Sequence, residues 1–217
     1  MASVRKTASR KKAARKQSGR KTAARKTAAR KTSPRAPALI ILIRHAEKPG
    51  ETKATPIDDS EITDPYLSSA GYYRAGAYSA YFDAKKNGGL YPKIDSIFAT
   101  KATRRSNRPF LTVAPLGAAV GKTVNVDYDN KPDGIAKLAA TLLGGKYAGQ
   151  TVLICWHHGT MPALAAALGY PNAPKIPRTS FDVVWKLAYS AGTSTPSFSS
   201  DGEHLMYGDT TVAVPGT

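Results

Sequence analysis

The residues best suited to chemistry in this chain stand directly after a short apolar run. Residues 38–43 read Ala-Leu-Ile-Ile-Leu-Ile, and Arg44 and His45 follow them. Such a run is short enough to form a strand buried on both faces, as in a parallel sheet. An imidazole at the end of that strand can attack phosphorus, and a guanidinium beside it can bind phosphate oxygens through two bonds. The stretch alone fits a solvated histidine at a charged strand end equally well.

A second apolar run ends in the same way. Residues 150–156 are followed by His157, His158 and Gly159. The carboxyl ends of parallel strands meet at one edge of an open α/β sheet, which is where such sheets bind ligands. His45 and one of these two histidines are therefore expected to lie together. Adjacent histidines can also bind a metal ion, but no cluster of Cys or His accompanies them, so we predict a site without metal or cofactor.

A third cation is expected at the start of a helix. Asn107 or Ser106 can cap a helix whose first turn contains Arg108 and Pro109, just beyond a predicted strand at residues 94–100. Backbone amides at a helix amino terminus attract anions, as a guanidinium does. Arg108 is therefore a candidate phosphate ligand, although a solvated arginine-rich loop would have the same sequence.

The rest of the sequence after residue 37 alternates strand-like and helix-like segments, which predicts an α/β fold. We expect three layers, α/β/α, with a mostly parallel central sheet and helices on both faces. A long loop at residues 49–66 should shape access to the site. The further elements are a helix from Ser68 or Ser69 to about residue 86, helices at 134–143 and 163–168, a short strand at 123–126, an edge strand at 181–189 and a last short strand at 204–209.

The first 36 residues differ sharply from the remainder. They hold 14 Lys or Arg and no Asp or Glu, whereas residues 37–217 hold 18 basic against 15 acidic residues, so the net charge of +17 belongs mainly to this tail. Arginine recurs every five residues in this tail. A five-residue period matches neither a helix face nor a strand face, and few residues of the tail are apolar, so we expect the tail to be disordered. The arginines of the repeat that would face polyanions are Arg5, Arg10, Arg15, Arg20, Arg25 and Arg30.

Three roles for this tail stay open. Basic residues release counterions from phosphates, which favours binding to nucleic acid or another polyanion and resembles the composition of histone tails. A mitochondrial transit peptide is also rich in arginine and free of acid, but the tail has no Leu, Ile or Phe for the apolar face. A plain solubilising tail is the third alternative. We predict two units, a disordered tail at 1–36 and a folded domain at 37–217.

Cysteine content and hydropathy bear on location. Cys155 is the only cysteine, so no intramolecular disulfide can form, which fits a reducing compartment. No apolar run approaches the length of a membrane span, and the basic amino terminus has no hydrophobic segment of a secretory signal. We predict an intracellular protein that is cytoplasmic or associated with nucleic acid, with targeting to an organelle by the tail as the alternative.

Taken together, these segments resemble the histidine phosphatase superfamily, which has the phosphoglycerate-mutase-like fold, and within it a subgroup of small phosphatases. The resemblance covers about residues 38–210 and leaves the tail outside. Four blocks carry it in order: Leu42-Ile43-Arg44-His45-Ala46-Glu47-Lys48-Pro49, residues 67–75, residues 108–112 ahead of Pro115-Leu116, and residues 152–159; residues 181–185 and Gly208-Asp209 add to it.

The resemblance implies a metal-independent phosphatase that forms a phosphohistidine. His45 matches the nucleophile, and Arg44 and Arg108 match the arginines of the phosphate pocket. His158, directly before Gly159, matches the second histidine of the pocket, and His157 is the less favoured choice. A backbone carbonyl is expected to hold the second ring nitrogen of His45, so that the other nitrogen can attack.

The general acid departs from the family pattern. Asp127 and Asp129 are the nearest choices after the arginine helix, and neither stands in a convincing motif. Glu47 is a third candidate, although an ion pair with a pocket arginine is the better expectation for it. A weak acid suits good leaving groups, such as phosphoramidates, phosphoanhydrides and aryl phosphates.

Three functions remain after this reading. The first is a phosphatase acting on a phosphorylated small molecule or phosphoprotein. The second is a mutase of the phosphoglycerate type, which we rank lower because the folded part is small and the acid is unclear. The third is a protein that binds nucleic acid or another polyanion and uses the phosphatase-like domain as a catalytically weak scaffold.

Overall fold

The computed structural model describes residues 36–50, 64–190, 193 and 195–209. The predicted tail, with Arg5 to Arg30, lies outside this part, and so does most of the predicted loop at 49–66. The division of the chain after residue 36 therefore stays a prediction. The elements in chain order are β1 (Leu39–Arg44), α1 (Ser69–Tyr81), β2 (Ser96–Ala99), α2 (Arg108–Val120), β3 (Val124–Asn125), α3 (Pro132–Leu143), β4 (Thr151–Trp156), α4 (Met161–Ala167), β5 (Val183–Ala188) and β6 (Ser197–Gly202).

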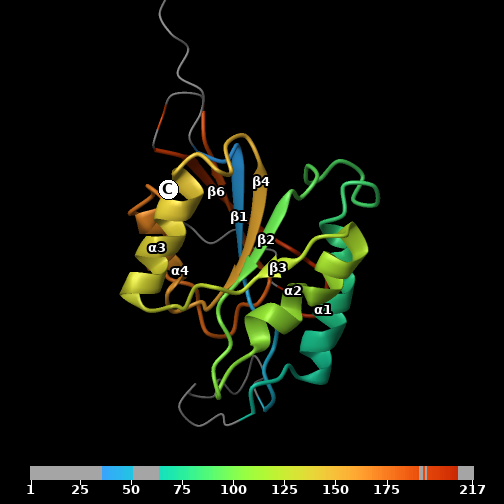
Figure 1. Cartoon of the computed structure of the whole chain (residues 1–217). Helices are drawn as coiled ribbons and strands as arrows, with labels where there is room; N and C mark the ends of the chain where they lie inside the picture. Colours follow the sequence, from blue (N-terminus) through green and yellow to red (C-terminus); the bar gives the residue numbers. More distant parts are fainter. Residues whose placement is uncertain (1–35, 51–63, 191–192, 194, 210–217) are drawn as a thin grey trace, which may run out of the picture. The chain divides into compact units, whose positions relative to one another are not determined.

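The strands of the described residues form one mixed sheet of six, in the order β3-β2-β4-β1-β5-β6. The neighbours β3, β2, β4 and β1 are parallel, whereas β5 runs antiparallel to β1 and to β6. Helices α1 and α2 cover one face of the sheet, and α3 and α4 cover the other (Figure 1). The predicted fold class, an α/β fold with helices on both faces of a mostly parallel sheet, is confirmed.

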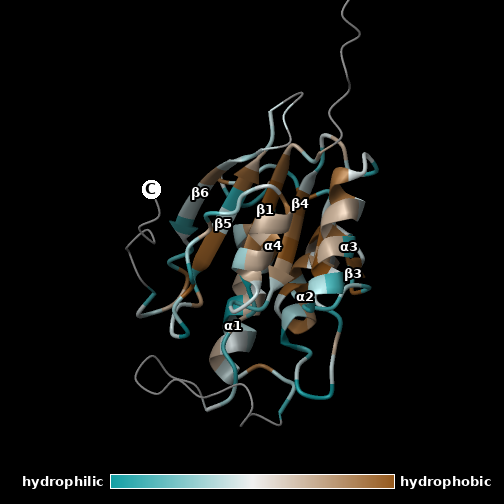
Figure 2. Cartoon of the chain, turned by 90° about the vertical axis from the view of Figure 1, so that its left-hand side faces the viewer, coloured by the Kyte–Doolittle hydropathy of each residue, from teal (hydrophilic) through white to brown (hydrophobic). Residues whose placement is uncertain are grey.

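Strand β1 lies at the centre of the sheet because both of its faces are apolar. Ile40 and Leu42 pack in the core on the side of α3 and α4. Ile41 and Ile43 pack in the second core, with residues of α1 and α2. All four side chains are buried, and the central strands show as a continuous apolar layer (Figure 2). Burial on two faces explains why this strand shows no alternation of polar and apolar residues.

Two predictions about the carboxyl-terminal strands were wrong. The segment around β5 is not an edge strand, because β5 pairs with β1 on one side and with β6 on the other. Among the described residues the last strand is Ser197–Gly202, and residues 204–209 form a loop with a turn at 207–208 instead. Strand β6 is mostly polar because it forms the outer edge of the sheet, where backbone hydrogen bonds to β5 hold the strand in place.

The register of β1 and β4 brings the two histidine-containing stretches to one edge. Arg44 lies opposite Trp156 in the parallel pair. The backbone amide of His45 then donates to the carbonyl of Trp156 over 3.0 Å, which continues the pairing one residue further. The next residues, His45 and His157, are therefore neighbours across the two chain segments. In the part of the chain that the structure describes, no helix is both long and apolar enough to cross a membrane.

Candidate active site

His45 lies at the centre of the candidate site and is held by its own loop. Its Nδ1 is 2.8 Å from the carbonyl oxygen of Ala46, so Nδ1 carries the proton and donates, and Nε2 carries the lone pair when the ring is neutral. The predicted backbone carbonyl on the second ring nitrogen is thereby confirmed. The side chain is 1 % exposed.

The surroundings of His45 favour the neutral ring. Burial is the largest cause and lowers the pKa of His45 well below 6.5. The positive charges of His157 and Arg44, and then of Arg108, lower this pKa further, against the hydrogen bond to Ala46. A neutral imidazole with a fixed tautomer is the form that can act as a nucleophile.

The histidine beside His45 is His157. Their ring centroids are 5.3 Å apart, and the planes meet edge to face at 72°. The sequence favoured His158 as the second histidine of the phosphate pocket. In the structure His158 follows His157, is half-buried, and has its Nδ1 inside the protein. The register explains the difference, since His157 follows Trp156 as His45 follows Arg44.

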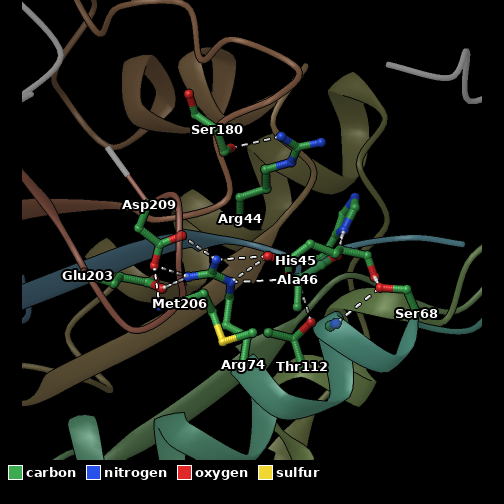
Figure 3. A network of polar contacts seen from close by, with 12 residues as sticks. Arg44, His45, Ala46, Ser68, Arg74, Thr112, Ser180, Glu203, Met206 and Asp209 are labelled. Atoms are coloured by element: carbon green, nitrogen blue, oxygen red, sulfur yellow. Dashed lines mark hydrogen bonds and ion pairs between the residues drawn. The ribbon is translucent and has the colours of Figure 1, made fainter. Parts of the chain in front are cut away.

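Arg44 points from the end of β1 toward the segment that precedes β5. Its Nη1 donates to the carbonyl oxygens of Arg178 and Ser180, the latter at 2.8 Å (Figure 3). Its guanidinium carbon lies 3.7 Å from the ring centroid of Phe181, which is a cation–π contact. The side chain is fully buried. The carbonyls and the aromatic ring therefore fix the plane of a buried guanidinium close enough to His45 to affect its pKa.

Arg108 begins α2, as the sequence predicted. Asn107 is the residue before the helix and Pro109 stands in its first turn, but the Asn107 side chain makes no capping bond. Nη1 of Arg108 donates to the carbonyl oxygen of Asp64 over 2.7 Å, and the side chain is 2 % exposed. The helix start thus places a second buried guanidinium near His45.

Helices α1 and α2 hold the loop that carries His45. The amide of Ala46 donates to Oγ1 of Thr112 over 2.9 Å, and that hydroxyl donates to the carbonyl of Arg108 over 2.8 Å. The amide of Ser68, the residue that caps α1, donates to the carbonyl of Glu47 over 2.9 Å. Sequence analysis missed Thr112, whose hydroxyl links the nucleophile loop to the turn of Arg108.

Glu47 pairs with an arginine that the sequence did not single out. Both of its carboxylate oxygens accept from Arg74 in α1, at distances from 2.8 to 3.2 Å. Arg74 also pairs with Glu203 and Asp209. The expectation of an ion pair for Glu47 is correct in kind, but the structure assigns Arg74 to it. Glu47 has a structural task here, which weakens its candidacy as general acid.

Asp127 and Asp129, the other two candidate acids, lie in the loop between β3 and α3. Oδ2 of Asp127 accepts from Asn125 over 2.7 Å, and Oδ1 of Asp129 accepts from the amide of Lys131 over 3.1 Å, which fixes the chain just before α3. Both line an open hollow of about 410 Å³ with residues of the start of α3. These contacts give both carboxylates a role in the local turn.

Within the described residues, no group of three or more His, Cys, Asp or Glu side chains is arranged to hold a metal ion. The candidate site consists of His45, His157, Arg44 and Arg108, and Thr112 supports the His45 loop through its bond to the Ala46 amide. Its chemistry is that of an anion site beside a neutral imidazole.

Comparisons with known proteins support the fold. No protein-family model matches the sequence, and no curated protein matches it. The fold is of the class found in histidine phosphatases. One such structure is the protein histidine phosphatase SixA in complex with tungstate, which superposes with a TM-score of 0.53 at 15 % identity, over 76 % of this chain and 97 % of the other.

Two further structures are less similar in shape. SixA from Nakamurella multipartitia has a TM-score of 0.44 at 19 % identity, over 73 % of this chain and 86 % of the other. SixA from Agrobacterium tumefaciens has a TM-score of 0.40 at 19 % identity, over 70 % and 92 %. At 15 % identity, the comparison with the tungstate complex shows a shared α/β fold and nothing beyond it.

Proposed function

We propose that the chain is a metal-independent phosphatase that hydrolyses a phosphate ester or related phospho-compound through a phosphohistidine on His45. The observation that carries the proposal is a neutral, tautomer-fixed imidazole beside two buried guanidiniums and a second imidazole. Phosphoryl transfer depends mainly on positioning and on positive charge around the phosphoryl oxygens. The fold shared with a histidine phosphatase agrees with this chemistry.

The reaction has two steps. The lone pair on Nε2 of His45 attacks phosphorus, the bond from phosphorus to the leaving group breaks, and the leaving group departs with the electron pair and takes a proton from solvent. Water then attacks the phosphohistidine and gives up a proton to solvent, the P–N bond breaks, its electron pair returns to Nε2, and inorganic phosphate is released. Arg44 and Arg108 stabilise the negative charge on the phosphoryl oxygens in both steps.

We assign the second histidine of the pocket to His157, in place of His158. The basis is its ring contact with His45 and its place among the charges that lower the pKa of His45. Protonated, His157 would donate to a phosphoryl oxygen. His158 remains the alternative that the sequence favours.

The candidate acids point to substrates with good leaving groups. Glu47 is engaged by Arg74, and Asp127 and Asp129 shape the turn before α3. We therefore propose phosphoramidates, phosphoanhydrides or aryl phosphates as the substrate class, since these need little proton delivery.

The test is hydrolysis of p-nitrophenyl phosphate by the full chain in EDTA. We expect activity in the wild type and background activity in His45→Ala. Lys85→Ala is the control, because Lys85 is exposed and lies in the turn after α1; it should behave as the wild type. Full activity of His45→Ala would rule out the proposed nucleophile. A coupled assay for phosphate exchange between phosphoglycerates tests the mutase alternative, and exchange faster than hydrolysis would favour it.

One observation favours a scaffold that binds phospho-ligands with little turnover. His45 is 1 % exposed, which limits the access of a phosphoryl group to its ring. Tungstate, an analogue of phosphate, separates the two functions. Binding of tungstate, measured by calorimetry, together with hydrolysis supports the phosphatase, whereas binding without hydrolysis supports the scaffold.

We also propose that the tail binds nucleic acid or another polyanion, based on its 14 basic residues and lack of acidic ones. Each phosphate contact on duplex DNA contributes about 0.9 to the slope of log K against log salt. Removal of residues 1–36 should therefore weaken binding and flatten this slope. Equal affinity and slope with and without the tail would exclude this role.

A further inference from the structure

We propose that Arg74 is a positioning residue, which ties the carboxyl-terminal segment 203–209 to the loop that carries His45. The inference rests on the proposed function for its kinetic consequence, but its structural basis is independent of any substrate. Figure 3 shows the Arg74 guanidinium between the carboxylates of Glu203 and Asp209 on one side and the loop of His45 and Ala46 on the other. We call Arg74, Glu47, Glu203 and Asp209 the Arg74 cluster.

All three nitrogens of Arg74 are engaged within this cluster. Nε donates to Glu47, Nη1 to Glu203 and Asp209, and Nη2 to Glu47 and Asp209. The distances run from 2.7 to 3.2 Å, and Arg74 is 1 % exposed. A guanidinium has five N–H donors in a fixed fork, and here the fork is directed at carboxylates of the protein. Arg74 therefore acts on other residues and is not a ligand for the phosphate.

The cluster joins parts of the chain that are far apart in sequence. Glu203 and Asp209 lie 129 and 135 positions from Arg74. The turn between them is closed on itself, because the amide of Met206 donates to the Asp209 carboxylate and the amide of Asp209 donates to the carbonyl of Met206. Tyr78, one turn further along α1, donates to Glu203 over 2.6 Å. Segment 203–209 is thus fixed as a unit on α1.

On the other side, the cluster fixes the nucleophile loop. Glu47 stands two residues after His45, and its carbonyl is within 2.4 Å of the place where a Cβ on Gly71 would stand. Helix α1 therefore approaches this loop backbone to backbone, and only glycine permits the contact. Since the carbonyl of Ala46 selects the tautomer of His45, a shift of Glu47 is transmitted to the ring nitrogen that attacks.

The energetics of such a cluster argue for a positioning role over a stabilising one. One cation is shared by Glu47, Asp209 and Glu203, all largely removed from water, and burial raises the pKa of Glu203 to about 8. Burial of an ion pair costs solvation free energy that the attraction between the charges often does not offset, so apolar residues in the same place would stabilise the fold equally well. A planar guanidinium, however, fixes the directions of several carboxylates at once, which an apolar contact does not do.

The test uses the full chain with Asp209→Asn and Arg74→Lys. Asparagine keeps the shape of Asp209 without its charge, and lysine keeps the charge of Arg74 but cannot bridge Glu47 and Asp209. The matched control is Asp201→Asn, which removes a carboxylate from the more exposed pair Lys186–Asp201. The readouts are kcat and KM with p-nitrophenyl phosphate and the ¹⁵N chemical shifts of the His45 ring. Circular dichroism confirms that each variant is folded.

We expect both cluster variants to lose kcat by about tenfold or more, with KM nearly constant, and their His45 nitrogens to shift toward a mixture of tautomers. The control should stay within about twofold in kcat with unchanged ring shifts. Wild-type kcat and ring shifts in either folded cluster variant would overturn the inference. An inactive wild type would refute the proposed function instead, and the ring shifts would still decide the role of Arg74.

Discussion

The hydroxyl of Thr112 offers the sharpest single-atom test of how the nucleophile is held. Oγ1 accepts from the Ala46 amide over 2.9 Å and donates to the Arg108 carbonyl over 2.8 Å, in a fully buried position. Thr112→Val replaces this hydroxyl with a methyl group of nearly the same size. No cavity forms, but the amide of Ala46 loses its acceptor.

The magnitude follows from that lost acceptor. A buried N–H left without a partner costs about 1–3 kcal/mol, so we expect the free energy of unfolding of Thr112→Val to fall by that amount. If relaxation of the Ala46 loop raises the activation barrier by about 1.4 kcal/mol, kcat falls about tenfold. Thr112→Ser keeps the hydroxyl and removes one methyl group, which costs about 1 kcal/mol of stability and should leave kcat unchanged.

The assay compares the two variants by urea unfolding and by hydrolysis of p-nitrophenyl phosphate. Both variants should be destabilised to a similar extent, and only Thr112→Val should lose kcat. Since stability changes in both, a difference in kcat reports the hydroxyl itself. Equal kcat values in Thr112→Val and Thr112→Ser would refute the reasoning that Thr112 positions the nucleophile loop.

Three further outcomes are expected. Burial raises the pKa of Glu203 to about 8, so the folded state holds a proton that the unfolded state releases from about pH 4.5 upward. The free energy of unfolding should therefore fall on the order of 1 kcal/mol per pH unit between pH 4.5 and pH 8. Glu203→Gln should remove this slope in urea titrations. His157→Asn should lower kcat/KM at least about tenfold more than His158→Asn, and the reverse order would restore the histidine that the sequence favours. Because the pKa of His45 lies well below 6.5, its neutral form should persist to acidic pH, and a rate that falls with a midpoint at or above 6.5 would contradict its burial.

Local patterns in the sequence were enough to predict the central strands. The apolar runs that became β1 and β4 favour buried strands at these lengths; β1 ends in Arg44, and His157 follows directly after β4. The start of α2 followed from Pro109, which suits the first turn of a helix. These features depend on a few adjacent residues, so a sequence contains them directly.

Local sequence patterns do not predict the register between strands. Our proposal of His157 over His158 rests on Arg44 facing Trp156, and a shift by one residue would exchange the two histidines. The Arg74 cluster was missed for a related reason. Its members come from three segments, and residues 203–209 have no periodicity that indicates burial. The edge strand β6 is mostly polar and was placed too late in the chain because its pairing comes from the backbone.

The most direct measurement of the central claim is the site of phosphorylation during turnover. Full-length protein mixed with a phosphoramidate or aryl phosphate, quenched at alkaline pH where phosphohistidine survives, can be digested and sequenced by mass spectrometry. Attack by Nε2 predicts phosphate on His45, and His45→Asn should abolish it. Phosphate found on His157 or His158 instead, or turnover in His45→Asn at the wild-type rate, would contradict the account.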